Sequence, residues 1–331
     1  MRRRRVRRAV PRALRDLISQ VSVFTVIAMS LAIAGVSSLQ VAHHYGWLKS
    51  PDNALAARPS PGGTGVDAAA QEAGFNDFTT SQNDIASIPT DAPSADILKR
   101  GALKSGTWLP ILMYHYIRVA PQGDRVGFAL SVTPIDFAQQ MQYLKDNGYT
   151  TLTMHDVDLI LTGQRQAPAK PIALTFDDGY SDFYTTAAPI LRGVGLTATN
   201  YVPTQLVGDQ AGAYMTWAQI QELDRQGLEM AAHSQFHVDV SKVNAQRAKI
   251  EIFGARADLE QHLGHLVVDW AYPYGGFNYA SIKLVHDAGY ASATITEGGA
   301  WHDQGQMPLL TRVRVGGGES LAQFAGAIAK P

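Results

Sequence analysis

From residue 108 onward, apolar runs that predict buried strands alternate with amphipathic segments that predict helices. Strands are expected at 109–114, 171–176, 197–202, 228–232, 266–271, 290–294 and 309–315. Helices are expected at 134–148, 182–193, 216–227, 243–263, 279–289 and 320–329. This alternation favours a parallel sheet, and about seven strands in roughly 225 residues is the size of a β/α barrel. We therefore predict an α/β fold, a distorted (β/α) barrel, over residues 107–331.

The N-terminal part of the chain has a different pattern. Residues 1–16 contain eight arginines and one aspartate, and the next 25 residues, 17–41, contain no charged side chain. About 20 apolar residues cross a bilayer as a helix, and flanking arginines stay on the cytoplasmic side. We expect a cytoplasmic basic segment at 1–16 and a single-pass transmembrane signal-anchor at 17–41, with the rest of the chain periplasmic or extracellular. A cleaved signal peptide is the alternative, although its apolar core is normally only about 7–15 residues long.

Residues 42–106 lack sustained periodicity and are rich in proline, glycine, alanine, serine, aspartate and threonine. This composition predicts a flexible, disordered linker between the membrane and the barrel.

Composition narrows the possible functions. The chain has no cysteine, which excludes a disulfide scaffold, a thiolate zinc site and a cysteine nucleophile. Beyond residue 16 it carries 20 basic and 28 acidic side chains, so the part that folds is acidic overall. A nucleic-acid partner needs a basic face and is therefore not expected.

Polar side chains follow several of the predicted strands. They are His115, Asp177, Asp178, His233, His237 and the run 272–275. In a β/α barrel the C-terminal ends of the strands share the face where active sites lie, so these residues converge. One aspartate and two histidines suit a catalytic zinc with an open position for water. A second aspartate could stay off the metal and accept the proton of that water.

The chain resembles the polysaccharide deacetylase family in three motifs. They are Thr-Phe-Asp-Asp-Gly-Tyr at 175–180, His-Ser-Gln-Phe-His at 233–237 and Tyr-Pro-Tyr-Gly at 272–275. Ile-Leu-Met-Tyr-His at 111–115 and Met-Thr-Trp at 215–217 also resemble exported members, particularly the poly-N-acetylglucosamine deacetylases. The resemblance runs from residue 108 to the predicted strand at 309–315.

This resemblance implies a distorted β/α barrel that binds one divalent metal ion, with zinc favoured, and hydrolyses N-acetyl groups on a polysaccharide. It implies that Asp178, His233 and His237 are metal ligands and that Asp177 is the general base. It also implies that the backbone N–H of Tyr274 helps to hold the tetrahedral oxyanion.

Two departures from the family pattern concern the base and the acid. Ala271 stands where many members carry an arginine that orients the base, and His302, in a polar glycine-rich loop, is the only histidine after residue 290. Both departures resemble the poly-N-acetylglucosamine subgroup, in which the acid comes from the early Tyr-His motif. We therefore predict that His115 is the general acid, with a nearby carboxylate raising its pKa above about 6.5.

Three aromatic side chains near the motifs, Trp217, Trp270 and Tyr272, are candidates for stacking on sugar rings, with packing in the core as the alternative. The predicted activity is removal of N-acetyl groups from a polysaccharide containing N-acetylglucosamine, outside the cytoplasm. Two alternatives stay open at this point. One is a glycoside hydrolase on the same barrel, which needs two carboxylates flanking the bond. The other is a membrane-anchored, metal-free or inactive polysaccharide-binding protein.

Overall fold

The computed structural model describes residues 93–99, 102–209 and 211–331. The predicted basic segment and the anchor at 17–41 lie outside these residues. Within the described ranges, no helix is long and apolar enough to cross a bilayer. The end of the predicted linker is folded, because Ala95–Lys99 forms the 3-10 helix η1 and Ile97 is buried in the larger hydrophobic cluster. The folded part therefore begins before the predicted boundary at residue 107.

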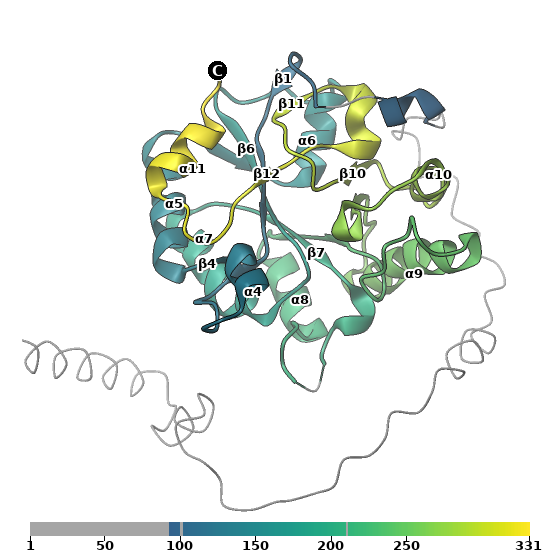
Figure 1. Cartoon of the computed structure of the whole chain (residues 1–331), viewed down its shortest axis with the longest axis horizontal. Helices are drawn as coiled ribbons and strands as arrows, with labels where there is room; N and C mark the ends of the chain where they lie inside the picture. Colours follow the sequence, from purple (N-terminus) through teal and green to yellow (C-terminus); the bar gives the residue numbers. More distant parts are fainter. Residues whose placement is uncertain (1–92, 100–101, 210) are drawn as a thin grey trace, which may run out of the picture. The chain divides into compact units, whose positions relative to one another are not determined.

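Parallel strands form the centre of the domain (Figure 1). In spatial order they are β10 (Ser292–Thr294), β9 (Asp269–Ala271), β8 (Glu229–Ala232), β7 (Thr199–Val202), β6 (Pro171–Phe176), β2 (Ile111–Tyr114) and β12 (Val313–Arg314). A further strand, β5 (Thr150–Leu152), pairs with the first half of β6. Leu310 forms a bridge with Thr294 of β10, and Val313 pairs with Leu112 of β2. Residues 310–314 therefore close the sheet into a distorted barrel, which confirms the α/β barrel of the predicted fold.

Helices cover the outside of the barrel (Figure 1). They are α5 (Pro134–Asp146), α7 (Ala188–Val194), α8 (Trp217–Arg225), α9 (Ala245–Leu263), α10 (Tyr279–Asp287) and α11 (Leu321–Ile328). N-cap side chains such as Thr133, Thr216 and Asn278 accept a hydrogen bond from the first turn and fix where these helices begin. The predicted helix at 182–193 instead starts as the π-helical turn η2 (Phe183–Ala187), just before Pro189, which has no N–H for a regular helical bond.

Some elements were not predicted from the sequence pattern. They are β3 (Tyr116–Ile117), α4 (Arg125–Leu130), β4 (Ser131–Val132), β5, α6 (Met154–Leu161), and the antiparallel pair of β1 (Thr107–Trp108) with β11 (Trp301–His302). The strand predicted at 309–315 is shorter than expected, because the 3-10 helix η5 (Gln304–Leu309) includes Leu309. These elements are short or irregular, and such segments have weak periodicity.

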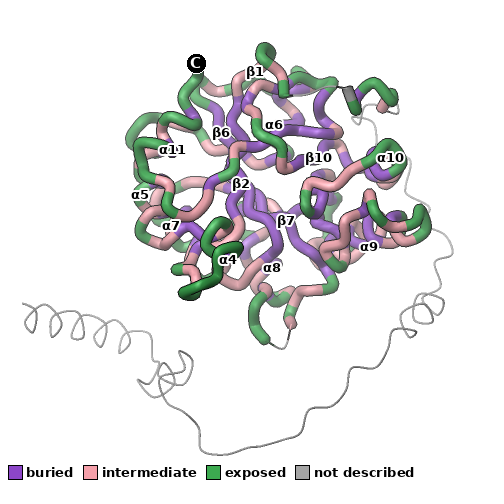
Figure 2. Tube along the Cα trace, in the orientation of Figure 1, coloured by how far each residue is buried: buried purple, intermediate pink, exposed green. Residues whose placement is uncertain are grey.

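The side chains of the barrel strands alternate between two hydrophobic clusters, and Figure 2 shows the buried strands at the centre of the domain. Ala173, Ala231 and Leu310 belong to the inner cluster with α6, whereas the residues flanking the two alanines pack against the outer helices. Because successive side chains of a strand point to opposite faces, the inward series continues to Asp177 and His233. The interior of the barrel thus leads directly to the predicted catalytic residues.

His302 is wholly buried in β11, where it pairs with Thr107 of β1. Because β1 precedes β2, this histidine lies near the end of the barrel where the strands begin, away from the end that carries Asp177. Burial lowers its pKa from 6.5 to about 4. His302 is therefore unsuited to be the general acid.

We expect His302 to make the protein less stable in mild acid. The folded state keeps the ring neutral down to about pH 4, whereas the unfolded chain binds a proton at about pH 6.5. Its contribution to stability is therefore complete above about pH 6.5 and is lost as the pH falls towards about 4, by at most about 3 kcal/mol. Lowering the pH from about 7.5 to about 4.5 should therefore reduce the thermal midpoint of His302→Phe less than that of the wild type. The exposed His155→Phe is the control and should follow the wild type; equal falls in all three proteins would contradict this origin.

Candidate active site

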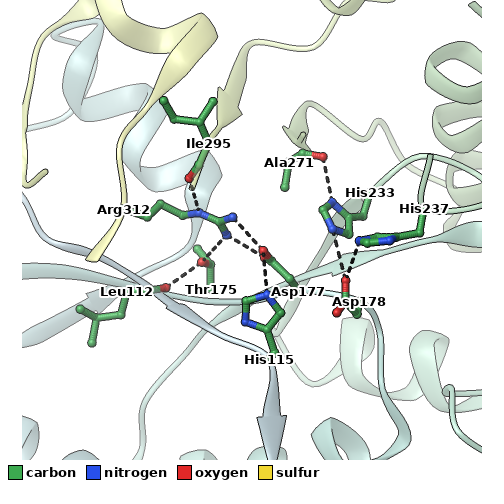
Figure 3. Close-up of polar contacts among 10 residues, drawn as sticks. All are labelled: Leu112, His115, Thr175, Asp177, Asp178, His233, His237, Ala271, Ile295 and Arg312. Carbon is green, nitrogen blue, oxygen red and sulfur yellow. Dashed lines mark hydrogen bonds and ion pairs between the residues drawn. The ribbon is translucent and has the colours of Figure 1, made fainter. Parts of the chain in front are cut away.

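Three side chains with metal-ligating atoms meet beyond the ends of β6 and β8 (Figure 3). Asp178 is the second residue after β6, His233 directly follows β8, and His237 lies four residues further on. Oδ1 of Asp178 is 3.0 Å from Nε2 of His237 and 3.4 Å from Nε2 of His233. We call these three residues the ligand triad. The structure brings together the side chains that the family resemblance implied.

The triad fits a single divalent metal ion. Oδ1 of Asp178 is buried without a hydrogen-bond partner among the described residues, although buried polar atoms normally have one. Two ligands of one tetrahedral zinc, each about 2.0–2.2 Å from it, lie about 3.3–3.5 Å apart. The separations of 3.0 and 3.4 Å between Asp178 and the histidines are close to this value. One carboxylate and two imidazoles also form a donor set that zinc uses in catalytic sites.

Backbone strain is concentrated at this site. Among the described residues, the non-glycine residues with positive φ are Asp178 (74°), Ser234 (61°), His237 (56°) and Tyr274 (59°). Each lies in one of the three motifs that follow β6, β8 and β9. Left-handed backbone is uncommon outside glycine and costs on the order of 1 kcal/mol or more per residue, so the surrounding structure must hold it in place.

The histidine loop is held from two sides. The Nδ1 nitrogen of His233 lies 2.8 Å from the carbonyl oxygen of Ala271 and donates to it, which leaves Nε2 free to bind a metal. On the other side, Glu251 of α9 is wholly buried. Its Oε2 accepts hydrogen bonds from the backbone N–H groups of Gln235 and Phe236, both at 2.9 Å. Glu251 therefore fixes the loop between the two histidines of the triad.

Asp177 forms a buried ion pair with an arginine that the sequence analysis did not assign to the site. Arg312 is wholly buried, and its two terminal nitrogens each lie 2.7 Å from one carboxylate oxygen of Asp177 (Figure 3). The same guanidinium donates to the carbonyl oxygen of Ile295 at 3.0 Å and to Oγ1 of Thr175 at 3.1 Å. Arg312 thus supplies the positive charge that the family pattern places at the position of Ala271.

This ion pair controls the protonation of Asp177. Burial alone would raise the pKa of the carboxyl group, but the charge and hydrogen bonds of Arg312, helped by His233 and His115, lower it below the ordinary value. Burial opposes ionisation of Asp178 as well, and there the two ligating histidines hold the pKa well below its usual range. Both neighbouring carboxylates are therefore ionised at neutral pH.

His115 lies beside the base, as the sequence predicted. Its Nε2 is 3.9 Å from Oδ2 of Asp177, and its Nδ1 is buried with no hydrogen-bond partner among the described residues. The expectation that a carboxylate lifts its pKa above about 6.5 is wrong. Burial lowers the pKa of His115 and outweighs the attraction of Asp177 and Asp178, while Arg312 adds repulsion.

The predicted sugar-stacking residues lie elsewhere. Trp270 and Tyr272 have no exposed surface and belong to the outer hydrophobic cluster, so the prediction is wrong for both. They flank Ala271, which points inward, and so they point outward towards the helices. Trp217 stacks on the ring of His262 with centroids 3.7 Å apart, and it packs against the same cluster.

Tyr274 is the aromatic residue that the structure places at the triad. Its side chain is 68% exposed, and its ring centroid is 4.5 Å from that of His237. The turn η4 (Pro273–Gly275), within the third motif, holds it there. The role of its backbone N–H towards an oxyanion stays a prediction.

Comparison with known proteins agrees with this geometry. A family model described as polysaccharide deacetylase matches residues 164–293. The Bacillus subtilis protein YxkH, whose name assigns it provisionally to the polysaccharide deacetylases, is 33% identical over 221 residues, which is 66% of this chain and 76% of YxkH. The poly-β-1,6-N-acetyl-D-glucosamine N-deacetylase of Escherichia coli K12 is 25% identical over 241 residues, 60% of this chain, and the match spans 36% of that enzyme.

Among solved structures, the Streptococcus pyogenes deacetylase PplD in complex with acetate aligns with a TM-score of 0.64 and 28% identity. That alignment covers 68% of this chain and the whole of PplD. The family match, the relative at one-third identity and the shared fold agree with the motifs and with the ligand triad. The chain therefore belongs to the polysaccharide deacetylase family, whose members are amide hydrolases that act on N-acetyl groups.

Proposed function

We propose that this protein is a metal-dependent hydrolase that removes N-acetyl groups from a polysaccharide containing N-acetylglucosamine. The observation that carries the proposal is the separation of two neighbouring carboxylates into different environments. Asp178 faces two histidines, whereas Asp177 is clamped by Arg312. A metal site and an ionised proton acceptor therefore lie side by side, as hydrolysis of an amide by activated water requires.

The proposed polymer rests on the relatives and on the position of the acid. One relative is named as a poly-β-1,6-N-acetyl-D-glucosamine N-deacetylase, although the chain spans about a third of its length. The histidine nearest to the base is His115, from the early Tyr-His motif that resembles the same subgroup. These two features favour N-acetylglucosamine units over other acetylated sugars.

The chemistry divides among the residues of the site. A divalent ion held by the ligand triad, for which the donor set favours zinc, would polarise the acetyl carbonyl and acidify water. Asp177 accepts the proton of the attacking water, because Arg312 keeps it ionised and fixes its orientation. The backbone N–H of Tyr274 donates to the developing oxyanion.

His115 then protonates the departing sugar amine. Burial keeps its pKa low, so the ring does not have to be charged before the attack. Oδ2 of Asp177, which takes up the proton of water, lies 3.9 Å from Nε2 of His115. In this scheme the proton passes from water to Asp177, then to His115 and to the amine.

We also propose that the barrel acts outside the cytoplasm, attached to the cell membrane through residues 17–41. The support is the 25-residue run without charge that follows eight arginines. Membrane fractionation with N-terminal sequencing tests the attachment: an intact N-terminus in the membrane fraction agrees with it, and a processed N-terminus contradicts it.

The first prediction separates metal ligands from the base. Asp178→Ala, His233→Ala and His237→Ala should each lose both bound metal and acetate release, since three ligands leave no redundancy. Asp177→Asn should keep the metal but lose most turnover, because an amide cannot accept the proton. Metal content and acetate release from defined N-acetylglucosamine oligosaccharides, with and without chelator, measure both effects. New reducing ends without acetate would indicate a glycosidase and overturn the proposed function.

The second prediction concerns Arg312. Arg312→Gln removes the charge that offsets the burial of Asp177, so the pKa of Asp177 should rise and the acidic limb of the pH–rate profile should move to higher pH. Turnover at neutral pH should fall on the order of 10² or more, and stability should fall by about 3 kcal/mol because a buried charge loses its partner. Arg314→Gln, which removes an exposed arginine two residues later in β12, is the matched control. An unshifted acidic limb in Arg312→Gln would show that Arg312 does not act on the base.

The third prediction tests His115 as the acid. His115→Gln should retain metal but lose about 10²–10⁴ in turnover on an N-acetylated oligosaccharide. On an aryl acetate, whose leaving group needs no proton, the loss should be under about tenfold, because the acid then has no task. Equal losses on both substrates would point to a structural role for His115. The exposed His265→Gln serves as the control and should match the wild type on both.

A further inference from the structure

Three tyrosines stack in a row beside the ligand triad. The ring centroids of Tyr116 and Tyr180 are 3.7 Å apart with an interplanar angle of 16°, and those of Tyr180 and Tyr214 are 5.4 Å apart at 25°. The guanidinium of Arg118 lies 3.4 Å from the ring centroid of Tyr116 and covers the far end of the row. None of these side chains has a part in the chemistry derived above.

The row is attached to the loop that carries Asp178. The backbone N–H of Met215 donates to the carbonyl oxygen of Gly179 at 3.0 Å, and that of Ser181 donates to Ala213 at 2.8 Å. Between these two hydrogen bonds, Tyr180 and Tyr214 face each other across a short antiparallel bridge. Cross-strand neighbours of this kind hold their side chains on one face. Tyr214 is therefore held opposite Tyr180, which lies two residues after Asp178 of the ligand triad.

One end of the row is available to a ligand. Tyr180 stacks with both neighbouring tyrosines, and Tyr116 is contacted by Tyr180 and by Arg118. Tyr214 is partly exposed, and among the described residues no ring or cation is stacked on its outer side. A flat aromatic face thus lies on the loop that pairs with the residues directly after Asp178.

We infer that Tyr214 forms a second sugar subsite, which binds the pyranose unit next to the one whose acetyl group lies at the triad. The inference rests on the proposed function and specifies its substrate as an oligomer or polymer rather than a single sugar. A β-linked pyranose presents a face of C–H groups that packs on an aromatic ring, while its hydroxyls remain in water. The Tyr116–Tyr180 stack supports Tyr214 from behind, so little side-chain freedom is lost on binding.

The test compares chain lengths. For a β-1,6-linked N-acetylglucosamine tetrasaccharide, Tyr214→Ala should raise KM about five- to tenfold, which is the range that one aromatic contact provides. The KM for the single sugar should stay at the wild-type value, since one unit held at the triad does not reach Tyr214. Tyr214→Phe keeps the ring and should behave as the wild type. Tyr214→Leu keeps an apolar contact with Tyr180 and should lose tetrasaccharide affinity as the alanine variant does.

Controls separate this subsite from folding and from the proposed function. Tyr279→Ala removes a 40%-exposed tyrosine on α10 and should leave the ratio of the two KM values unchanged. Binding of the tetrasaccharide to chelator-treated protein, followed by NMR, gives a readout that needs no catalysis. Equal tetrasaccharide affinity of the wild type and Tyr214→Ala, or an equal rise of KM for both chain lengths, would overturn the subsite. If tetrasaccharide binding depends on the Tyr214 ring but no metal-loaded sample releases acetate, the subsite is supported and the proposed function is overturned.

Discussion

The buried pair of Asp177 and Arg312 links the closure of the barrel to its chemistry. The two residues are 135 positions apart, with 3% and 0% of their side chains exposed, and both carboxylate oxygens are engaged. Arg312 lies in the segment that bridges β10 and β2, so the strand that completes the barrel also delivers the charge. Either ion alone in this setting would cost several kcal/mol. The ionised base and the closed barrel therefore depend on each other.

Two adjacent aspartates take different roles because the backbone turns between them. Asp177 continues the inward series of β6 and meets Arg312, whereas Asp178 has a φ of 74° and faces the histidines. Identical carboxyl groups thus have different partners. Enzymes with paired carboxyl groups use such differences in environment to give each group a different role. The strain of this turn is held by the loop of residues 213–215, which hydrogen-bonds to the backbone on both sides of Tyr180.

Strand ends and helix periodicity were sufficient to predict the barrel and the convergence of the polar residues at one of its ends, whereas the family resemblance implied which aspartate joins the triad. Parallel strands place their C-terminal ends on one face, so residues such as Asp178 and His233 had to converge once the strands were located. The same alternation could have excluded Trp270 and Tyr272 as sugar contacts. Ala271 faces inward with the other small residues of the interior, and its two neighbours must then face the helices. Excluding them requires knowing which residues of β9 face the interior of the barrel. A strand of three residues is too short for its sequence pattern to show this.

The contributions of Arg312 and Glu251, and the low pKa of His115, depend on contacts between distant segments and left no local pattern to find. An arginine can orient the base from any inward position at the right height in the barrel, because its side chain is long and its fork matches a carboxylate. Sequence comparison looks for that arginine beside the third motif and finds Ala271. The structure finds it two residues after Leu310, which bridges Thr294 of β10, the residue that pairs with Ala271 of β9. What the site requires is a guanidinium at one place in space, and the barrel allows more than one strand to supply it.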